Sequence, residues 1–195
     1  SDVCERRHVD PVDPTLPRRE GKVSRSIDVG CGVDATWRRI GGNLRTMIRK
    51  AEREGFRCRE ASGEEGLDVF YSVFAENMRD LGTPVLGRGV FEAIRDAFGE
   101  SAWFGTAWLA GEPVAAGCGF RWNREFEMTW ASSLRAHNKV APNMLLYWRF
   151  IERASEQGLT TFNFGRCTPG GGTHRFKLQW GFAAVAALAH DTLIT

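Results

Sequence analysis

The stretch from Pro142 to Phe182 decides the fold, and it reads PNMLLYWRFIERASEQGLTTFNFGRCTPGGGTHRFKLQWGF. An apolar helix is expected to begin at Pro142, which suits the first helical position, and to end before Gly158. A strand over residues 159–164 follows and leads into a polar, glycine-rich turn over residues 165–172. A short second helix then carries polar and cationic residues, His174, Arg175 and Lys177. Such groups after a buried strand are where α/β proteins usually place their chemistry, so we expect the functional site here.

The composition is that of an ordered chain with little net charge. With 195 residues, the chain is long enough for one large domain or for one domain with an arm. Hydrophobic residues make up 43% of the sequence, which excludes wholesale disorder. The net charge is only +2, so the protein is not a polycation overall, yet arginines and lysines crowd residues 38–59. Such a local patch could bind phosphates or an acidic partner.

Cysteines and apolar runs indicate the compartment. The five cysteines are scattered, odd in number and lack CxxC spacing, so we predict neither a disulfide framework nor a metal site. Free cysteines are typical of a reducing cytoplasm. No apolar run approaches the ~20 residues needed to span a bilayer, and no signal peptide is recognised. The sequence therefore predicts a soluble cytoplasmic protein without a transmembrane segment.

Hydrophobic periodicity predicts one α+β domain over residues 43–195, preceded by an arm or linker over residues 1–42. The arm contains three prolines among charged residues and has room for a short strand over residues 26–29. In the domain we expect helices over residues 43–55, 67–81, 89–98 and 142–157, and strands over residues 56–60, 103–109, 114–122, 125–133, 159–164 and within 183–194. The predicted fold class is therefore α+β, with a central mixed sheet flanked by helices.

This order of elements is that of the GNAT acyltransferase fold, and several stretches resemble the FemAB-like family within it. The run LRTMIRKA at residues 44–51, before Gly55, resembles the family pattern of a basic helix that ends at glycine. Four stretches resemble the branch associated with exosortase and PEP-CTERM loci: NMRDLGTP at 77–84, WASSLR at 130–135, APNMLLYW at 141–148 and FNFGRCTPGGGTHRFKLQWGF at 162–182. The resemblance covers residues 16–185 and corresponds to the C-terminal half of proteins that usually carry two GNAT-like halves.

The resemblance implies an N-acyl or aminoacyl transferase that acts on an amine of a cell-envelope precursor, in peptidoglycan or exopolysaccharide. The donor would be aminoacyl-tRNA or acyl-CoA as a co-substrate, with no tightly bound cofactor. Two alternatives stay open: an acyl-CoA-dependent GNAT N-acetyltransferase, and a non-catalytic anion-binding half-enzyme. Residues 135–142 contain no glycine, whereas a glycine-rich loop there usually holds the pyrophosphate of CoA. Because one half of the family's proteins is missing, we expect an exposed apolar face and a homodimer.

Two residues are predicted to be catalytic. The resemblance places Lys177, in a pattern F-K-x-x-W-G, at the donor carbonyl, where a fixed ammonium would stabilise the oxyanion. A lysine at such a position can also be simply solvated. Asp80 is expected in a loop that covers the acceptor in GNAT folds, where it would orient or deprotonate the amine. The alternative for Asp80 is an ion pair at a helix end.

The predicted substrate-binding residues fall on five segments. Arg45 and Arg49 form a cationic stripe along one helix, and a bound phosphate would relieve their mutual repulsion. Trp130 and Ser132 lie on the strand that offers backbone N–H groups to the reacting carbonyl in the GNAT fold, although Trp130 alone would more often be a core residue. The remaining candidates are Arg79 beside Asp80, Asn143 at a helix start whose amides suit an anion, and Arg166 and Arg175, which flank Lys177.

Overall fold

A six-stranded mixed sheet forms the centre of the computed structural model, which describes residues 3–7, 18–19, 23–61, 63–181 and 190–194. In sheet order the strands are β3 (Val23–Asp28), β8 (Thr161–Cys167), β7 (Glu125–Ser133), β6 (Glu112–Trp122), β5 (Ala102–Leu109) and β4 (Arg57–Ala61). Only β7 and β8 pair in parallel, and the other neighbours are antiparallel. The predicted mixed sheet and GNAT-type α+β fold are confirmed.

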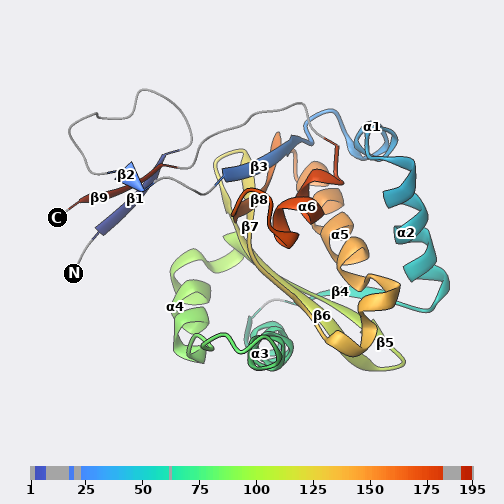
Figure 1. The fold of residues 1–195 in the computed structure, drawn as a ribbon, viewed down its shortest axis with the longest axis horizontal. Coiled ribbons are helices and arrows are strands. Elements are labelled where there is room, and N and C mark those ends of the chain that lie inside the picture. The colour runs from blue at the N-terminus through green and yellow to red at the C-terminus, as the bar shows by residue number, and fades with distance from the viewer. Residues whose placement is uncertain (1–2, 8–17, 20–22, 62, 182–189, 195) are drawn as a thin grey trace.

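Helices cover both faces of this sheet (Figure 1). On one face lie α1 (Val33–Arg39), α2 (Gly42–Arg53), α5 (Pro142–Glu156) and α6 (Gly172–Leu178), and on the other lie α3 (Gly63–Asp80) and α4 (Arg88–Phe98). Short 3-10 turns precede β5 and α5, namely η1 (Gly99–Ser101) and η2 (Arg135–Val140). Each face has its own hydrophobic core, and the apolar side of α5 supplies much of the first one. None of the helices in the described part of the chain is long and apolar enough to cross a bilayer.

The segment 23–42 is part of this folded unit, which differs from the predicted arm. Strand β3 pairs with β8, and Val29 and Ile40 are buried in the first core. The predicted boundary between residues 42 and 43 therefore does not mark where the folded unit starts. The hydrophobic periodicity of this segment is weak, because α1 is only seven residues long and ends in two arginines.

Three other elements differ from their predicted bounds. Strand β8 continues to Cys167 because its outer edge stays paired with β3 beyond the predicted end. Helix α3 begins at Gly63, four residues before its predicted start, and Arg79 and Asp80 are its last two residues, at the border of the loop in which they were expected. Of the last predicted strand, residues 183–189 lie outside the described residues, and β9 (His190–Ile194) pairs with β1 (Val3–Arg7) and β2 (Arg18–Arg19) in a separate sheet.

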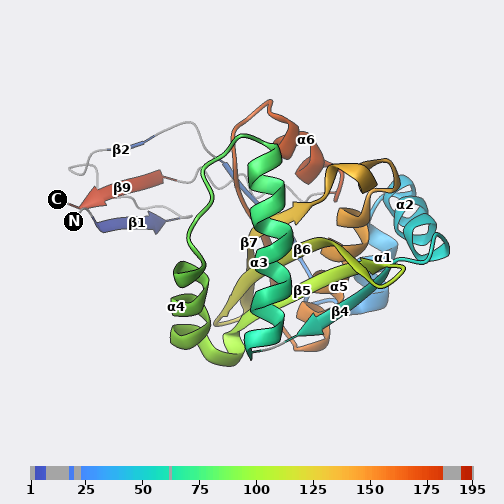
Figure 2. The same cartoon turned by 90° about the horizontal axis from the view of Figure 1, so that it is seen from below.

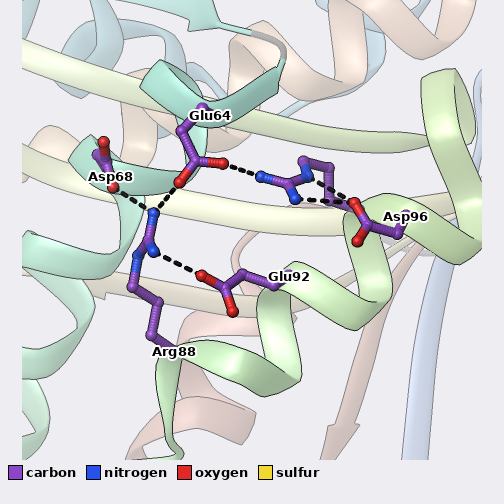
Figure 3. A network of polar contacts seen from close by, with 6 residues as sticks. Glu64, Asp68, Arg88, Glu92 and Asp96 are labelled. Atoms are coloured by element: carbon purple, nitrogen blue, oxygen red, sulfur yellow. Dashed lines mark hydrogen bonds and ion pairs between the residues drawn. The ribbon is translucent and has the colours of Figure 1, made fainter.

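Ion pairs hold α4 against the first turns of α3 (Figure 3). Arg88 contacts the carboxylates of Glu64, Asp68 and Glu92, and Arg95 also contacts Glu64. These side chains are partly exposed, so each pair contributes little by itself. Together they fix the direction of α4, because one arginine links two turns of α3 to α4.

The burial of residue 29 predicts a measurable loss of stability upon truncation. Val29 is 0% exposed, whereas Val90 on α4 is 43% exposed. We expect Val29→Ala to lower the free energy of unfolding by about 2 kcal/mol, because two methyl groups leave the core. Val90→Ala, the matched control, should change it by less than about 0.5 kcal/mol. Urea unfolding measures both, and equal effects would contradict the inclusion of residues 23–42 in the fold.

Candidate active site where β7 and β8 separate

The two parallel strands at the centre of the sheet pair over only a short distance. Their register runs from Glu125 opposite Thr161 to Glu127 opposite Asn163. Beyond this point β7 continues beside β6, while β8 turns away with β3. We call the place where their pairing ends the fork. A fork of this kind leaves one edge of β7 without a neighbouring strand among the described residues.

Gly165 is the residue at which β8 leaves β7. Its φ is +69°, and a Cβ built on it would lie 2.9 Å from the carbonyl oxygen of Met128. Any larger residue would therefore be strained and would also press on β7. The bend in β8 and the separation of the strands both depend on glycine at this position.

The edge of β7 at the fork offers backbone N–H groups. Leu134 N donates to Val114 O at 2.9 Å, which fixes the direction of the N–H groups along the end of the strand. Since these groups alternate along a strand, the N–H groups of Ala131 and Ser133 point away from β6, toward the fork. A carbonyl or amide group of a ligand could accept hydrogen bonds there.

The register of β7 is irregular next to this edge. Cys118 pairs with Trp130 and Gly119 pairs with Met128, so Thr129 is an extra residue in β7, as in a β-bulge. A Cβ at Gly119 would lie 2.2 Å from the carbonyl oxygen of Glu127, so this glycine permits the irregularity. The hydroxyl oxygen of Thr129 is buried and has no hydrogen-bond partner within the part of the chain that the structure describes. Bulges often reorient backbone and side chains next to active sites.

Lys177 on α6 is buried at the fork. It is 3% exposed, and its Nζ donates to the carbonyl oxygens of Gly165 at 2.7 Å and Arg166 at 3.0 Å. Burial lowers the pKa of Lys177 to about 8, while Cys167 and Glu127 act in the opposite direction. An ammonium group has three donors, so two contacts to neutral carbonyls leave one donor for a further group.

The far end of β7 is fixed by asparagines from both faces of the sheet. Asn77 on α3 donates through Nδ2 to the hydroxyl oxygen of Ser132 at 3.2 Å. Asn143 on α5 donates to the hydroxyl oxygen of Ser133 at 3.0 Å, and that hydroxyl donates to Asn138 Oδ1 at 3.0 Å. The Oδ1 atom of Asn143 is buried and has no hydrogen-bond partner among the described residues, so it could accept a hydrogen bond from an N–H group of a ligand.

The structure brings together two groups of the predicted site residues. Lys177, Arg166 and Arg175 surround the turn after β8, where Arg175 is exposed and donates to the carbonyl oxygen of Gly170. Ser132 and Asn143 lie at the end of β7. The two groups belong to the same edge of β7, separated by roughly 15 Å of extended strand.

The arginines of α2 have structural contacts away from the fork. Arg45 donates to the carbonyl oxygens of Trp37, Arg38 and Ile40, so its guanidinium holds the last turn of α1. The guanidinium of Arg49 lies over the ring of Trp37, 5.4 Å from its centroid. Arg49 also lines an open surface hollow of about 570 Å³ on α2. An anion role remains a prediction for Arg49, whereas Arg45 is occupied by backbone carbonyls.

Three further candidates lie on the α3 side of the sheet. Arg79 and Asp80 end α3 and approach each other at 3.9 Å, which matches the predicted alternative of a helix-end pair. Trp130 packs edge-on against Phe91 at 5.1 Å in the second core, which matches its alternative as a core residue. No contact given by the structure links these three side chains to Lys177.

Sequence reasoning missed Glu127 and Asn77. Glu127 is close enough to Lys177 to influence its pKa, yet an acid in an alternating strand reads as an exposed residue. Asn77 is buried within α3, and an asparagine inside a helix is a signal that its side chain has a specific partner. Among the described residues, the structure shows no group of three or more side chains that could hold a metal ion.

A family model described as acetyltransferase (GNAT) domain matches residues 38–178. The chain belongs to this GNAT family. Membership indicates an acyltransferase. No curated protein matches the sequence significantly.

Solved structures agree with the GNAT fold. FemX has 14% identity and a TM-score of 0.75, with 90% of this chain and 64% of FemX covered. L-PGS from Bacillus licheniformis has 15% identity and a TM-score of 0.64, with 91% of this chain and 61% of that chain covered. Ard1 from Thermoplasma volcanium has 17% identity and a TM-score of 0.53, with 71% of this chain and 95% of Ard1 covered. At these identities the likeness concerns the fold alone, and this chain spans less than two thirds of FemX and of L-PGS.

The close approach of Gly165 to β7 predicts that a side chain at residue 165 destabilises the protein. Gly158 has a similar φ of +72°, but a Cβ there would meet no atom within 4 Å. Both Gly→Ala variants acquire backbone strain, and only Gly165→Ala also forces a methyl group against Met128 O. We expect Gly165→Ala to lose at least ~1 kcal/mol more than Gly158→Ala in urea unfolding. Equal losses would mean that β7 and β8 are not in contact there.

The buried ammonium predicts a pH-dependent stability. The pKa of Lys177 is about 8 in the folded protein, below its ordinary value of 10.5. Between these values the unfolded chain binds the proton and the folded chain does not, so stability rises with pH in this window. Below pH 8 the ammonium is charged in both states and its burial opposes folding. Relative to Lys177→Met, wild-type stability should therefore increase by about 3 kcal/mol as pH rises through the window.

The control for this titration is Lys50→Met, which removes an exposed ammonium on α2. Unfolding free energies of all three proteins are measured by urea denaturation at several pH values. The difference between wild type and Lys50→Met is the baseline against which the Lys177→Met difference is compared. If the Lys177→Met difference changes with pH no more than this baseline, the ammonium is not desolvated at the fork.

Proposed function

We propose that the chain is an FemAB-like enzyme that transfers an acyl or aminoacyl group to an amine of a cell-envelope precursor. Its GNAT membership and its fold likeness to FemX support this. A further structural neighbour, from Agrobacterium fabrum, is named as a putative lysylphosphatidylglycerol synthetase, a name that describes aminoacyl transfer. The quoted motifs point to the exosortase-associated branch, with peptidoglycan or exopolysaccharide as the acceptor. Both proposed donors, aminoacyl-tRNA and acyl-CoA, are cytoplasmic molecules, so we place the reaction in the cytoplasm.

The observation that carries the proposal is the position of the Lys177 ammonium at the fork. Its Nζ is fixed by two carbonyl oxygens, and the unpaired edge of β7 lies beside β8 at the same place. A carbonyl group that entered the fork beside Gly165 would meet a fixed cation, and the backbone N–H groups farther along β7 could bind another carbonyl or amide group of the same donor. This arrangement suits a negative charge that develops on oxygen.

In the proposed reaction the amine nitrogen attacks the donor carbonyl carbon directly. The new C–N bond forms as the carbonyl π electrons move to oxygen, and Lys177 stabilises this oxyanion, while the N–H groups farther along β7 hold another part of the donor. The intermediate collapses with cleavage of the C–O bond of an ester or the C–S bond of a thioester. The leaving oxygen or sulfur takes the electron pair and a proton, and the attacking nitrogen loses its extra proton. No covalent enzyme intermediate is required.

Two carboxylates are candidates to accept that proton. Asp80 ends α3 as an exposed residue next to Arg79. Glu127 lies where β7 and β8 part, close enough to Lys177 to oppose the fall of its pKa. We favour Glu127 for this role, since a base must lie within reach of the reacting amine. Asp80 remains a candidate for orienting the acceptor.

The acyl-CoA alternative is supported by the start of α5. Ala141 has φ +51° and begins the helix without a side-chain cap, so the first N–H groups of α5 are not satisfied by a side chain. Such groups bind phosphate readily. A homodimer would supply additional surface for the acceptor.

A donor assay tests the proposed function. The protein is incubated with an amine-bearing envelope precursor together with one donor, which is aminoacyl-tRNA in one reaction and acyl-CoA in another. The acceptor is then analysed by mass spectrometry. Transfer from aminoacyl-tRNA supports the FemAB-like proposal, and transfer from acyl-CoA alone supports the acetyltransferase alternative. If neither donor supports transfer to peptidoglycan precursors or to amino-sugar precursors, the result would support the non-catalytic half-enzyme.

Loss of the ammonium should abolish most of this activity. We expect Lys177→Met to lower turnover by about a hundredfold or more, because a single oxyanion donor typically contributes ~3 kcal/mol to the barrier. Lys177→Arg, which retains a positive charge, should keep more activity than Lys177→Met if it folds. Circular dichroism and urea unfolding establish folding before the kinetics are compared. Unchanged transfer in folded Lys177→Met would remove Lys177 from the mechanism.

A further inference from the structure

A second pocket lies at the rim of the sheet opposite the fork. It has a volume of about 590 Å³ and is formed by β4, the starts of α3 and β5, the end of α4, η1, β6 and the last turns of α5. In Figure 2, α6 lies at the upper rim of the molecule, whereas the start of α3 and the end of α4 lie at the lower rim. Asn143 and Arg153 are ten residues apart on α5, which is about 15 Å along the helix. The pocket is therefore separate from the candidate active site.

Three arginines from three different elements line this pocket, against two glutamates. Arg95 comes from α4, Arg121 from β6 and Arg153 from α5, and the acids are Glu60 and Glu100. Arg95 is already paired with Glu64 and Asp96. Arg153 is paired with Glu60 at 2.7 Å. Arg121 differs, because it has no hydrogen-bond or ion-pair partner among the residues that the structure describes.

The wall behind these arginines is rigid. The guanidinium of Arg153 lies over Trp103, 4.1 Å from the ring centroid, and the other side of that ring stacks on Phe126 at 4.4 Å. Trp103 Nε1 donates to the carbonyl oxygen of Glu100 at 3.1 Å. Burial lowers the pKa of Arg153, Glu60 raises it, and the neighbouring charge of Arg121 lowers it again. Two like charges thus line the same preformed pocket.

We propose that this pocket binds the phosphate group of a small phosphorylated molecule, with Arg121 as its main ligand and Arg153 beside it. A phosphate oxygen accepts charge-assisted hydrogen bonds from a guanidinium, often in pairs, and its negative charge offsets the repulsion between the two arginines. The volume leaves room for a small organic group attached to the phosphate. The site is independent of the proposed transfer reaction, because it requires no residue of the fork.

Binding of inorganic phosphate tests the site. Isothermal titration at constant ionic strength compares wild type with Arg121→Met, with a control that removes an equal charge, and with a variant at the other predicted anion site. The control Arg124→Met lies three residues away on the same hairpin, and Arg49→Met tests the basic helix α2. We expect Arg121→Met to weaken binding about tenfold or more, and Arg124→Met to stay within about twofold of wild type.

A conservative variant keeps the test decisive if Arg121→Met folds poorly. Arg121→Lys retains the charge and loses the planar fork of donors, so it should show an intermediate loss. A phosphorylated sugar such as ribose 5-phosphate, titrated in parallel, should bind at least as well as inorganic phosphate. Absence of phosphate binding by wild type would overturn the proposal. So would an equal loss in Arg121→Met and Arg124→Met, or a loss confined to Arg49→Met.

Discussion

The close approach of Gly165 to the carbonyl oxygen of Met128 is the constraint on which the rest of the site depends. With φ +69° and no side chain, this residue lets β8 touch β7 and then turn away from it. The turn exposes the carbonyl oxygens of Gly165 and Arg166 to the interior of the fork, where Lys177 donates to both. The position of the ammonium is therefore a consequence of the bend in β8, and α6 is placed by the same contacts. A side chain at residue 165 would disturb strand and cation together.

Strand β7 can leave its neighbour because packing holds it from both faces. Residues that alternate along the strand enter the core under α5 and the core under α3 and α4. At its end, Ser132 and Ser133 receive hydrogen bonds from Asn77 and Asn143 on opposite sides. An edge strand with unpaired backbone groups usually invites association with other strands. Here the unpaired edge is buried at Ser132 and Ser133, where it can serve a ligand.

How much the sequence could predict depended on the range of the interactions involved. Periodicity and turn residues located the hairpin strands of residues 103–133 and helix α5, because these signals are local. The role of residues 23–42 was missed, since β3 gains its place only by pairing with β8, more than 130 residues later. Glu127 was missed for the same reason: its nearness to Lys177 depends on the fold. The spacing of Arg45 along its helix predicts an anion ligand, because that spacing gives no sign of the carbonyl oxygens that Arg45 binds at the end of α1.

The environment of Lys177 also bears on why a lysine occupies this place. Within the part of the chain that the structure describes, Lys177 donates to two neutral carbonyl oxygens. Desolvation of its ammonium opposes folding, and the nearby charge of Glu127 offsets this only in part. The turn itself does not need a charge, because a neutral donor could bind the same two carbonyls. A pKa of about 8 leaves the group mostly protonated near neutral pH, with a donor to spare for an incoming oxygen. Perturbed groups of this kind gather at functional sites, and the unpaired edge of β7 gives this one a place to act.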